Sequence, residues 1–65
     1  MYIKNARCVA ESEFGEHPDT YEVEVHASAA CTDQQILNFV EQSDSCFCGG
    51  YIVERPSFAL VRYYA

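Results

Sequence analysis

The sequence predicts a small α+β fold, in which an antiparallel β-sheet of about four strands, in the order ββαββ, has one helix packed on one face. Three observations support it. Residues 21–27 alternate between apolar and polar side chains, residues 31–44 hold a helix-start signal followed by helical spacing, and further strand patterns at 2–14, 46–54 and 57–65 flank them. No repeat, linker or low-complexity segment divides the chain, so residues 1–65 form one domain.

The first two strands are expected to pair across a turn. Residues 15–19 contain Gly15 and Pro18, which are typical of a turn, between the strand patterns at 2–14 and 21–27. In the second strand the apolar face comprises Tyr21, Val23, Val25 and Ala27. The polar face holds Glu22, Glu24 and His26.

The helix is predicted over about residues 33–43. Thr32 is a suitable N-cap, Gln35 three residues later completes a capping box, and Asp33 favours the positive end of the helix dipole. Cys31, just before the cap, is placed to pack on Ile36 as a hydrophobic staple. The predicted buried face consists of Ile36, Leu37 and Val40, with Phe39 beside them.

The last two strands leave one sheet face without a cover. Gly49 and Gly50 predict a bulge or bend in the strand at 46–54, and Pro56 lies in the turn before 57–65. The final strand is apolar on both sides, and its consecutive tyrosines at 63 and 64 must point to opposite faces. A patch formed by Tyr2, Tyr51 and one terminal tyrosine could anchor a partner or a homodimer, with core filling as the alternative.

Composition and charge narrow the possible functions. The chain has 65 residues, 49% of them hydrophobic, which is too apolar for a disordered acidic tail. Ten acidic against four basic residues give a formal net charge of −6, so we expect a basic partner and no direct binding of nucleic acid. The N-terminal residues lack the apolar run of a signal peptide and no stretch is long enough to span a bilayer, which predicts a cytoplasmic protein, monomeric or homodimeric.

The cysteines and histidines are not expected to form a catalytic or metal site. The chain holds Cys8, Cys31, Cys46 and Cys48, which provide one C-x-C pair, whereas zinc usually takes paired C-x₂₋₄-C knuckles. We expect reduced thiols packed as small hydrophobes, with zinc binding left as an alternative. His17 and His26 are expected at the solvated surface. No catalytic motif is present, so we expect neither enzymatic activity nor a cofactor.

The predicted hairpin is unusually acidic. Its carboxylates are Glu11, Glu13, Glu16, Asp19, Glu22 and Glu24. We expect Glu11 or Glu13 to lie opposite Glu22, because the other register would bury carboxylates among the valines. All four strand glutamates would then share one face. This row either keeps the sheet edge soluble or imitates the phosphates of nucleic acid, and on the second interpretation all six carboxylates are candidate partner-binding residues.

In its small size, acidic balance, compact sheet with one helix and lack of a catalytic motif, the chain resembles the phage-encoded anti-CRISPR proteins, particularly the DNA-mimicking inhibitors of type I CRISPR-Cas complexes. The resemblance implies a stoichiometric inhibitor in the host cytoplasm. Its acidic side chains would bind a basic nucleic-acid-binding subunit of the Cas surveillance complex and block DNA binding. The alternative is a small protein-interaction module that uses cysteine-bound zinc or the aromatic patch, with acidity serving only solubility.

Overall fold

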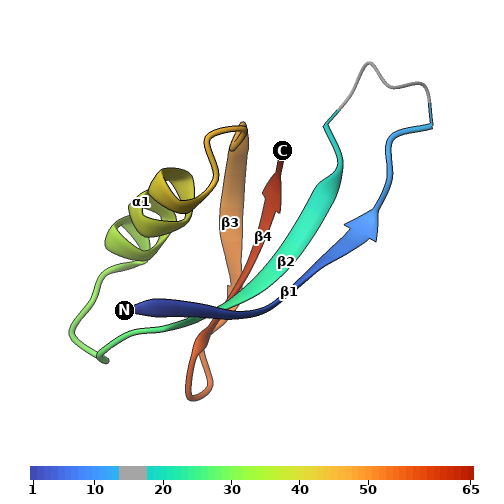
Figure 1. Cartoon of the computed structure of the whole chain (residues 1–65). Helices are drawn as coiled ribbons and strands as arrows, with labels where there is room; N and C mark the ends of the chain where they lie inside the picture. Colours follow the sequence, from blue (N-terminus) through green and yellow to red (C-terminus); the bar gives the residue numbers. More distant parts are fainter. Residues whose placement is uncertain (14–17) are drawn as a thin grey trace.

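The predicted α+β fold and element order are confirmed. A computed structural model describes residues 1–13 and 18–65. Its elements follow the order ββαββ: β1 (Tyr2–Ala10), β2 (Thr20–His26), α1 (Asp33–Ser43), β3 (Gly49–Glu54) and β4 (Ala59–Tyr64) (Figure 1). Within the described residues, no helix has both the length and the apolar character needed to cross a membrane.

The strands form one antiparallel sheet in the order β1-β2-β4-β3, which leaves β1 and β3 at the edges. The central pair is regular, with every residue from Thr20 to Val25 in β2 opposite one residue of β4. Both edge strands are irregular. The register shifts twice in β1 and once in β3, and Asn5 in the first shifted segment has a φ of 55°.

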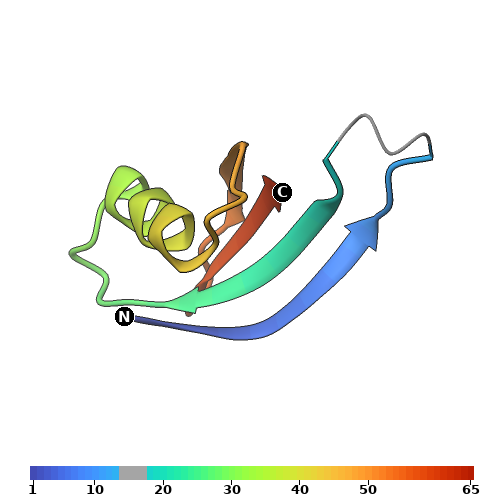
Figure 2. The same cartoon turned by 45° about the horizontal axis from the view of Figure 1, so that its top comes forward.

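Helix α1 begins as predicted. The Thr32 side chain accepts a hydrogen bond from the Gln35 backbone N–H, and the Gln35 side chain accepts one from the Thr32 backbone N–H, so two otherwise unpaired N–H groups of the first turn are satisfied. The helix covers a single face of the sheet (Figure 2).

The core lies between α1 and the central strands. Ile36 and Val40 of the helix are buried together with Val23, Val25 and Val61 of the sheet. Each such side chain contributes about 1.5–3 kcal/mol on burial. At one end, Tyr63 stacks with Tyr21 and Phe47 at centroid distances of 5.6 and 5.5 Å. Tyr63 therefore belongs to the core, whereas its neighbour Tyr64 is exposed.

Several sequence-based boundaries and the expected packing of the cysteines were wrong. β1 ends at Ala10, not near residue 14, and β3 begins at Gly49, after Cys46 and Cys48. Cys8, Cys46 and Cys48 are exposed, because they lie on an edge strand or in the connection before β3. Only Cys31 packs partly against the core. All four are free thiols.

The sheet face turned away from α1 has no helix over it, and we call it the open face. Cross-strand partners share a face, and the partners of the core valines lie on the helix side. The register therefore assigns these residues to the open face: Tyr2, Lys4, Arg7, Ala10, Thr20, Glu22, Glu24, His26, Gly49, Tyr51, Glu54, Leu60, Arg62 and Tyr64. Its exposed aromatic side chains are Tyr2, Tyr51 and Tyr64.

Candidate functional site

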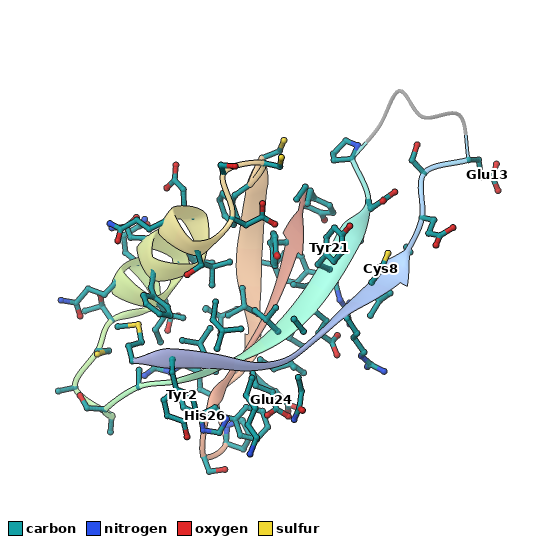
Figure 3. All side chains as sticks on the ribbon, in the orientation of Figure 1. Tyr2, Cys8, Glu13, Tyr21, Glu24 and His26 are labelled. Atoms are coloured by element: carbon teal, nitrogen blue, oxygen red, sulfur yellow. The ribbon has the colours of Figure 1, made fainter. Side chains whose placement is uncertain are left out.

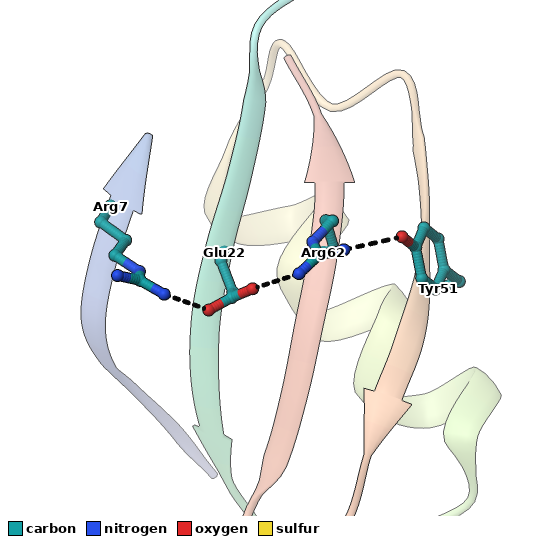
Figure 4. A network of polar contacts seen from close by, with 4 residues as sticks. All are labelled: Arg7, Glu22, Tyr51 and Arg62. Atoms are coloured by element: carbon teal, nitrogen blue, oxygen red, sulfur yellow. Dashed lines mark hydrogen bonds and ion pairs between the residues drawn. The ribbon is translucent and has the colours of Figure 1, made fainter. Parts of the chain in front are cut away.

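A charged network crosses the open face from β1 to β3 (Figure 4). Glu22 accepts a hydrogen bond from Arg7 Nη2 on one carboxylate oxygen and from Arg62 Nη2 on the other, each at 2.8 Å. Arg62 also donates to the Tyr51 hydroxyl at 3.3 Å. Glu22 has a side chain only 8% exposed, whereas that of Arg7 is 70% exposed.

The two arginines keep Glu22 ionised. Hydrogen bonds from Arg7 and then Arg62 hold the pKa of Glu22 below its usual value. In return, the hydrogen bond to Glu22, followed by that to Tyr51, raises the pKa of Arg62. Two guanidinium groups share one carboxylate, so the network retains a surplus positive charge.

A bulge in β1 puts Lys4 and Arg7 on the same face. Lys4 pairs with Glu24 and Arg7 with Glu22, so three steps along β1 match two steps along β2. In a regular strand, residues three apart would point to opposite faces. The extra residue lies in the segment that contains Asn5, whose positive φ is uncommon for a residue other than glycine.

The prediction that four glutamates form one row is wrong, because the observed register pairs the β2 glutamates with cations of β1. Glu22 lies opposite Arg7, not opposite Glu11 or Glu13, which follow the end of β1. Glu24 lies opposite Lys4 and accepts hydrogen bonds from Asn5 at 3.0 Å and from His26 at 3.4 Å. The inner carboxylates of the hairpin are therefore engaged within the protein.

The outer carboxylates are placed differently. Glu11 and Glu13 are exposed, and Asp19 is half-buried and accepts a hydrogen bond from the Ser12 backbone N–H at 2.8 Å. We call these three residues the acidic end. Figure 3 shows Glu13 at the end of the hairpin remote from the helix. The predicted site residue Glu16 lies outside the described residues, as does His17.

Charge is separated between the acidic end and the open face. Three of the four basic residues lie on the open face, where Lys4, Arg7 and Arg62 are balanced by Glu22, Glu24 and Glu54. The fourth, Arg55, is bonded to Asp33 at 2.9 Å. The formal net charge of −6 therefore arises outside the open face, and residues 11–19 supply most of it.

His26 was expected at the solvated surface, but the structure partly buries its side chain. Its ring is stacked between Tyr2 and Phe58, at centroid distances of 4.8 and 5.2 Å, and its side chain is 27% exposed. Figure 3 shows Tyr2 and His26 side by side on the open face. No motif in the sequence reveals this stack, because it depends on the pairing of Tyr2 with His26 across the two strands.

The described residues contain no group of three or more His, Cys, Asp or Glu side chains arranged to hold a metal ion. A cavity of about 320 Å³ beneath the start of α1 is lined mainly by apolar residues such as Val25, Ile36 and Phe58. Arg55, which also lines it, is engaged with Asp33.

The acidic end and the open face are thus the two surfaces whose chemistry bears on function. Comparisons with family models, with curated proteins and with solved structures found no match to this chain.

Proposed function

We propose that this protein is a stoichiometric inhibitor that binds a nucleic-acid-binding protein through the acidic end of its hairpin and keeps nucleic acid out of the basic groove. The separation of charge carries the proposal. A protein that needed acidity only for solubility could distribute its carboxylates anywhere. Here four of the ten lie in residues 11–19, a segment without lysine or arginine, while three of the four cations lie on the open face.

Solvated carboxylates suit this role. Glu11 and Glu13 are exposed and form no ion pair with a described residue, so a basic partner gains attraction from them without first breaking such a pair. Such attraction accelerates association and weakens as salt is added. Glu22 is unsuitable as a direct contact, because both of its carboxylate oxygens are already bonded to arginine. The proposed contacts are therefore the acidic end together with Glu16 of the same segment.

The partner class that we propose is the basic DNA-binding subunit of a type I CRISPR-Cas surveillance complex. The test is a DNA mobility shift with that complex, with the protein added before the DNA at low and at high salt. We expect loss of the shifted band at low salt and its return at high salt. Persistence of the band at low salt would contradict the proposal for this partner.

Two variants test whether inhibition depends on the position of the carboxylates or only on the total charge. In the first, Glu11→Gln and Glu13→Gln remove charge from the acidic end, and we expect the inhibition to weaken. The second adds Gln34→Glu and Gln42→Glu at exposed positions of α1, which restores the net charge to −6 on another surface. The second variant should remain as weak as the first. Full recovery of inhibition would show that net charge alone matters and would refute the assigned site.

A further inference from the structure

The open face combines exposed aromatic side chains with balanced charge. Tyr2, Tyr51 and Tyr64 are 57%, 43% and 38% exposed. The three cations of this face equal its three carboxylates in number, so two copies that meet here bring no net charge together. We propose that a second copy of this chain packs on the open face, so that two sheets form a two-fold symmetric sandwich.

The register arranges the open face in two rows that cross all four strands in the order β1, β2, β4, β3. The first row is Arg7, Glu22, Arg62 and Tyr51, and the second row is Lys4, Glu24, Leu60 and Glu54. In the first row, cations at two positions alternate with a carboxylate and an aromatic ring. The second row begins with a cation at one edge and ends with a carboxylate at the other.

A two-fold axis can lie between the two sheets, parallel to the strands and midway between β2 and β4. It places each row of one copy over the same row of the other copy in the opposite order, so that β1 lies over β3 and β2 lies over β4. In the first row, Arg7 then faces Tyr51 of the partner subunit, while Glu22 lies over Arg62 of the partner subunit with both of its carboxylate oxygens already bonded within its own chain. In the second row, Lys4 faces Glu54 of the partner subunit. Because the interface is two-fold symmetric, each of these contacts occurs twice.

The contacts of Arg7 and Lys4 use groups that remain available in the single chain. Arg7 donates to Glu22 through one nitrogen, and its largely exposed guanidinium retains further N–H donors and a face that can stack on a tyrosine ring. Lys4 forms no ion pair with any described residue. Packed sheets lie about 10 Å apart, within reach of paired long side chains.

The other axis in the plane of the face is unfavourable. An axis perpendicular to the strands would place β1 of one copy over β1 of the other, and would bring the Lys4 and Arg7 side chains of the two copies together. Like charges placed opposite each other repel. The charge pattern therefore favours the axis that is parallel to the strands.

Lys4 and Glu54 provide a test specific to this arrangement. They lie on the two edge strands with two strands between them, so they are separated by roughly 14 Å within one chain and do not pair there. The test measures the dimer dissociation constant by sedimentation equilibrium for the wild type, Lys4→Glu, Glu54→Lys and the double variant. Circular dichroism checks that each variant is folded.

We expect the wild type to dimerise and the dimer dissociation constant to rise about tenfold or more in each single variant. The double variant should recover the wild-type dissociation constant. Net charge alone predicts a different result, because Lys4→Glu makes the chain more acidic and would weaken the dimer, whereas Glu54→Lys makes it less acidic and would strengthen it. Glu41→Lys on exposed α1 is the matched control and should leave the dimer unchanged.

A monomeric wild type at high protein concentration would overturn the proposal. A double variant as weak as the single variants would overturn it too. The outcome is independent of the proposed function, since inhibition depends on the acidic end and dimerisation on the open face.

Discussion

Gly50→Ala tests the close contact between the two C-terminal strands. Gly50 lies opposite Tyr63, and a Cβ at this position would come within 2.7 Å of Tyr63 Cβ, 2.8 Å of the Arg62 carbonyl oxygen and 3.0 Å of Tyr63 Cα. These atoms belong to the backbone or are fixed to it, so a change of rotamer cannot relieve the overlap. The strands would have to separate locally.

The expected cost is about 1–3 kcal/mol, as for other side chains inserted into packed sites. A chain of 65 residues has a free energy of unfolding of about 3–10 kcal/mol, so this loss is a large fraction of the total. The sign of the change in the free energy of unfolding is informative. At an uncrowded site, replacing glycine by alanine stabilises a protein by about 0.4–1 kcal/mol, because it restricts the unfolded chain.

Urea unfolding followed by circular dichroism measures the effect. Alanine at position 63 still carries a Cβ, so the overlap remains in the double variant Gly50→Ala with Tyr63→Ala. The double variant should therefore be no more stable than Tyr63→Ala alone. An unfolding midpoint for Gly50→Ala equal to or above that of the wild type would refute the reasoning. It would show that β3 absorbs the methyl group without separating from β4.

Three further changes test the helix cap and two titrating groups. Thr32→Ala removes the bond to the Gln35 N–H and should cost about 1 kcal/mol in the free energy of unfolding, whereas Thr32→Ser should cost little. Because the pKa of Glu22 is held below its usual value of 4.5, its stabilising contribution is present above that pH and lost as the pH falls further. Glu22→Gln should therefore lower the melting temperature near neutral pH, with a difference from the wild type that shrinks in acid. Burial, and then the hydrogen bond to Asp44, raises the pKa of Tyr63 from 10.0 to about 12, so the wild type should lose stability between these values and Tyr63→Phe should lose less, as measured by urea unfolding across that range.

The elements that depend on local chemistry were predictable from the sequence. The capping box at Thr32 and Gln35 defined the start of α1, and the apolar positions within it identified Ile36 and Val40 as core residues. The alternation in β2 likewise identified its buried valines. In each case, neighbours along the chain determine the outcome, so sequence periodicity is sufficient.

The candidate site was less predictable because it depends on one bulge. Simple alternation places Lys4 and Arg7 on opposite faces, and the shift around Asn5 places them together opposite Glu24 and Glu22. Lys4 and Arg7 could be expected near the acidic hairpin, but the sequence did not predict that Arg7 would lie directly opposite Glu22. Of the predicted acidic residues, the structure leaves Glu11 and Glu13 exposed. It bonds Glu22 to Arg7 and also to Arg62, which the sequence pattern had not associated with it.

The same irregularities affect how the protein behaves at high concentration. A sheet with two free edges can extend by adding strands from other molecules, which is a common route to aggregation. Here the two edge strands carry the register shifts, while the enclosed strands pair regularly. A strand approaching β1 meets a backbone whose unpaired N–H and C=O groups change direction near Asn5 and again before Ala10, so it cannot form a continuous ladder. The bulge that brings Arg7 to Glu22 is thus also expected to hinder growth of the sheet into fibres.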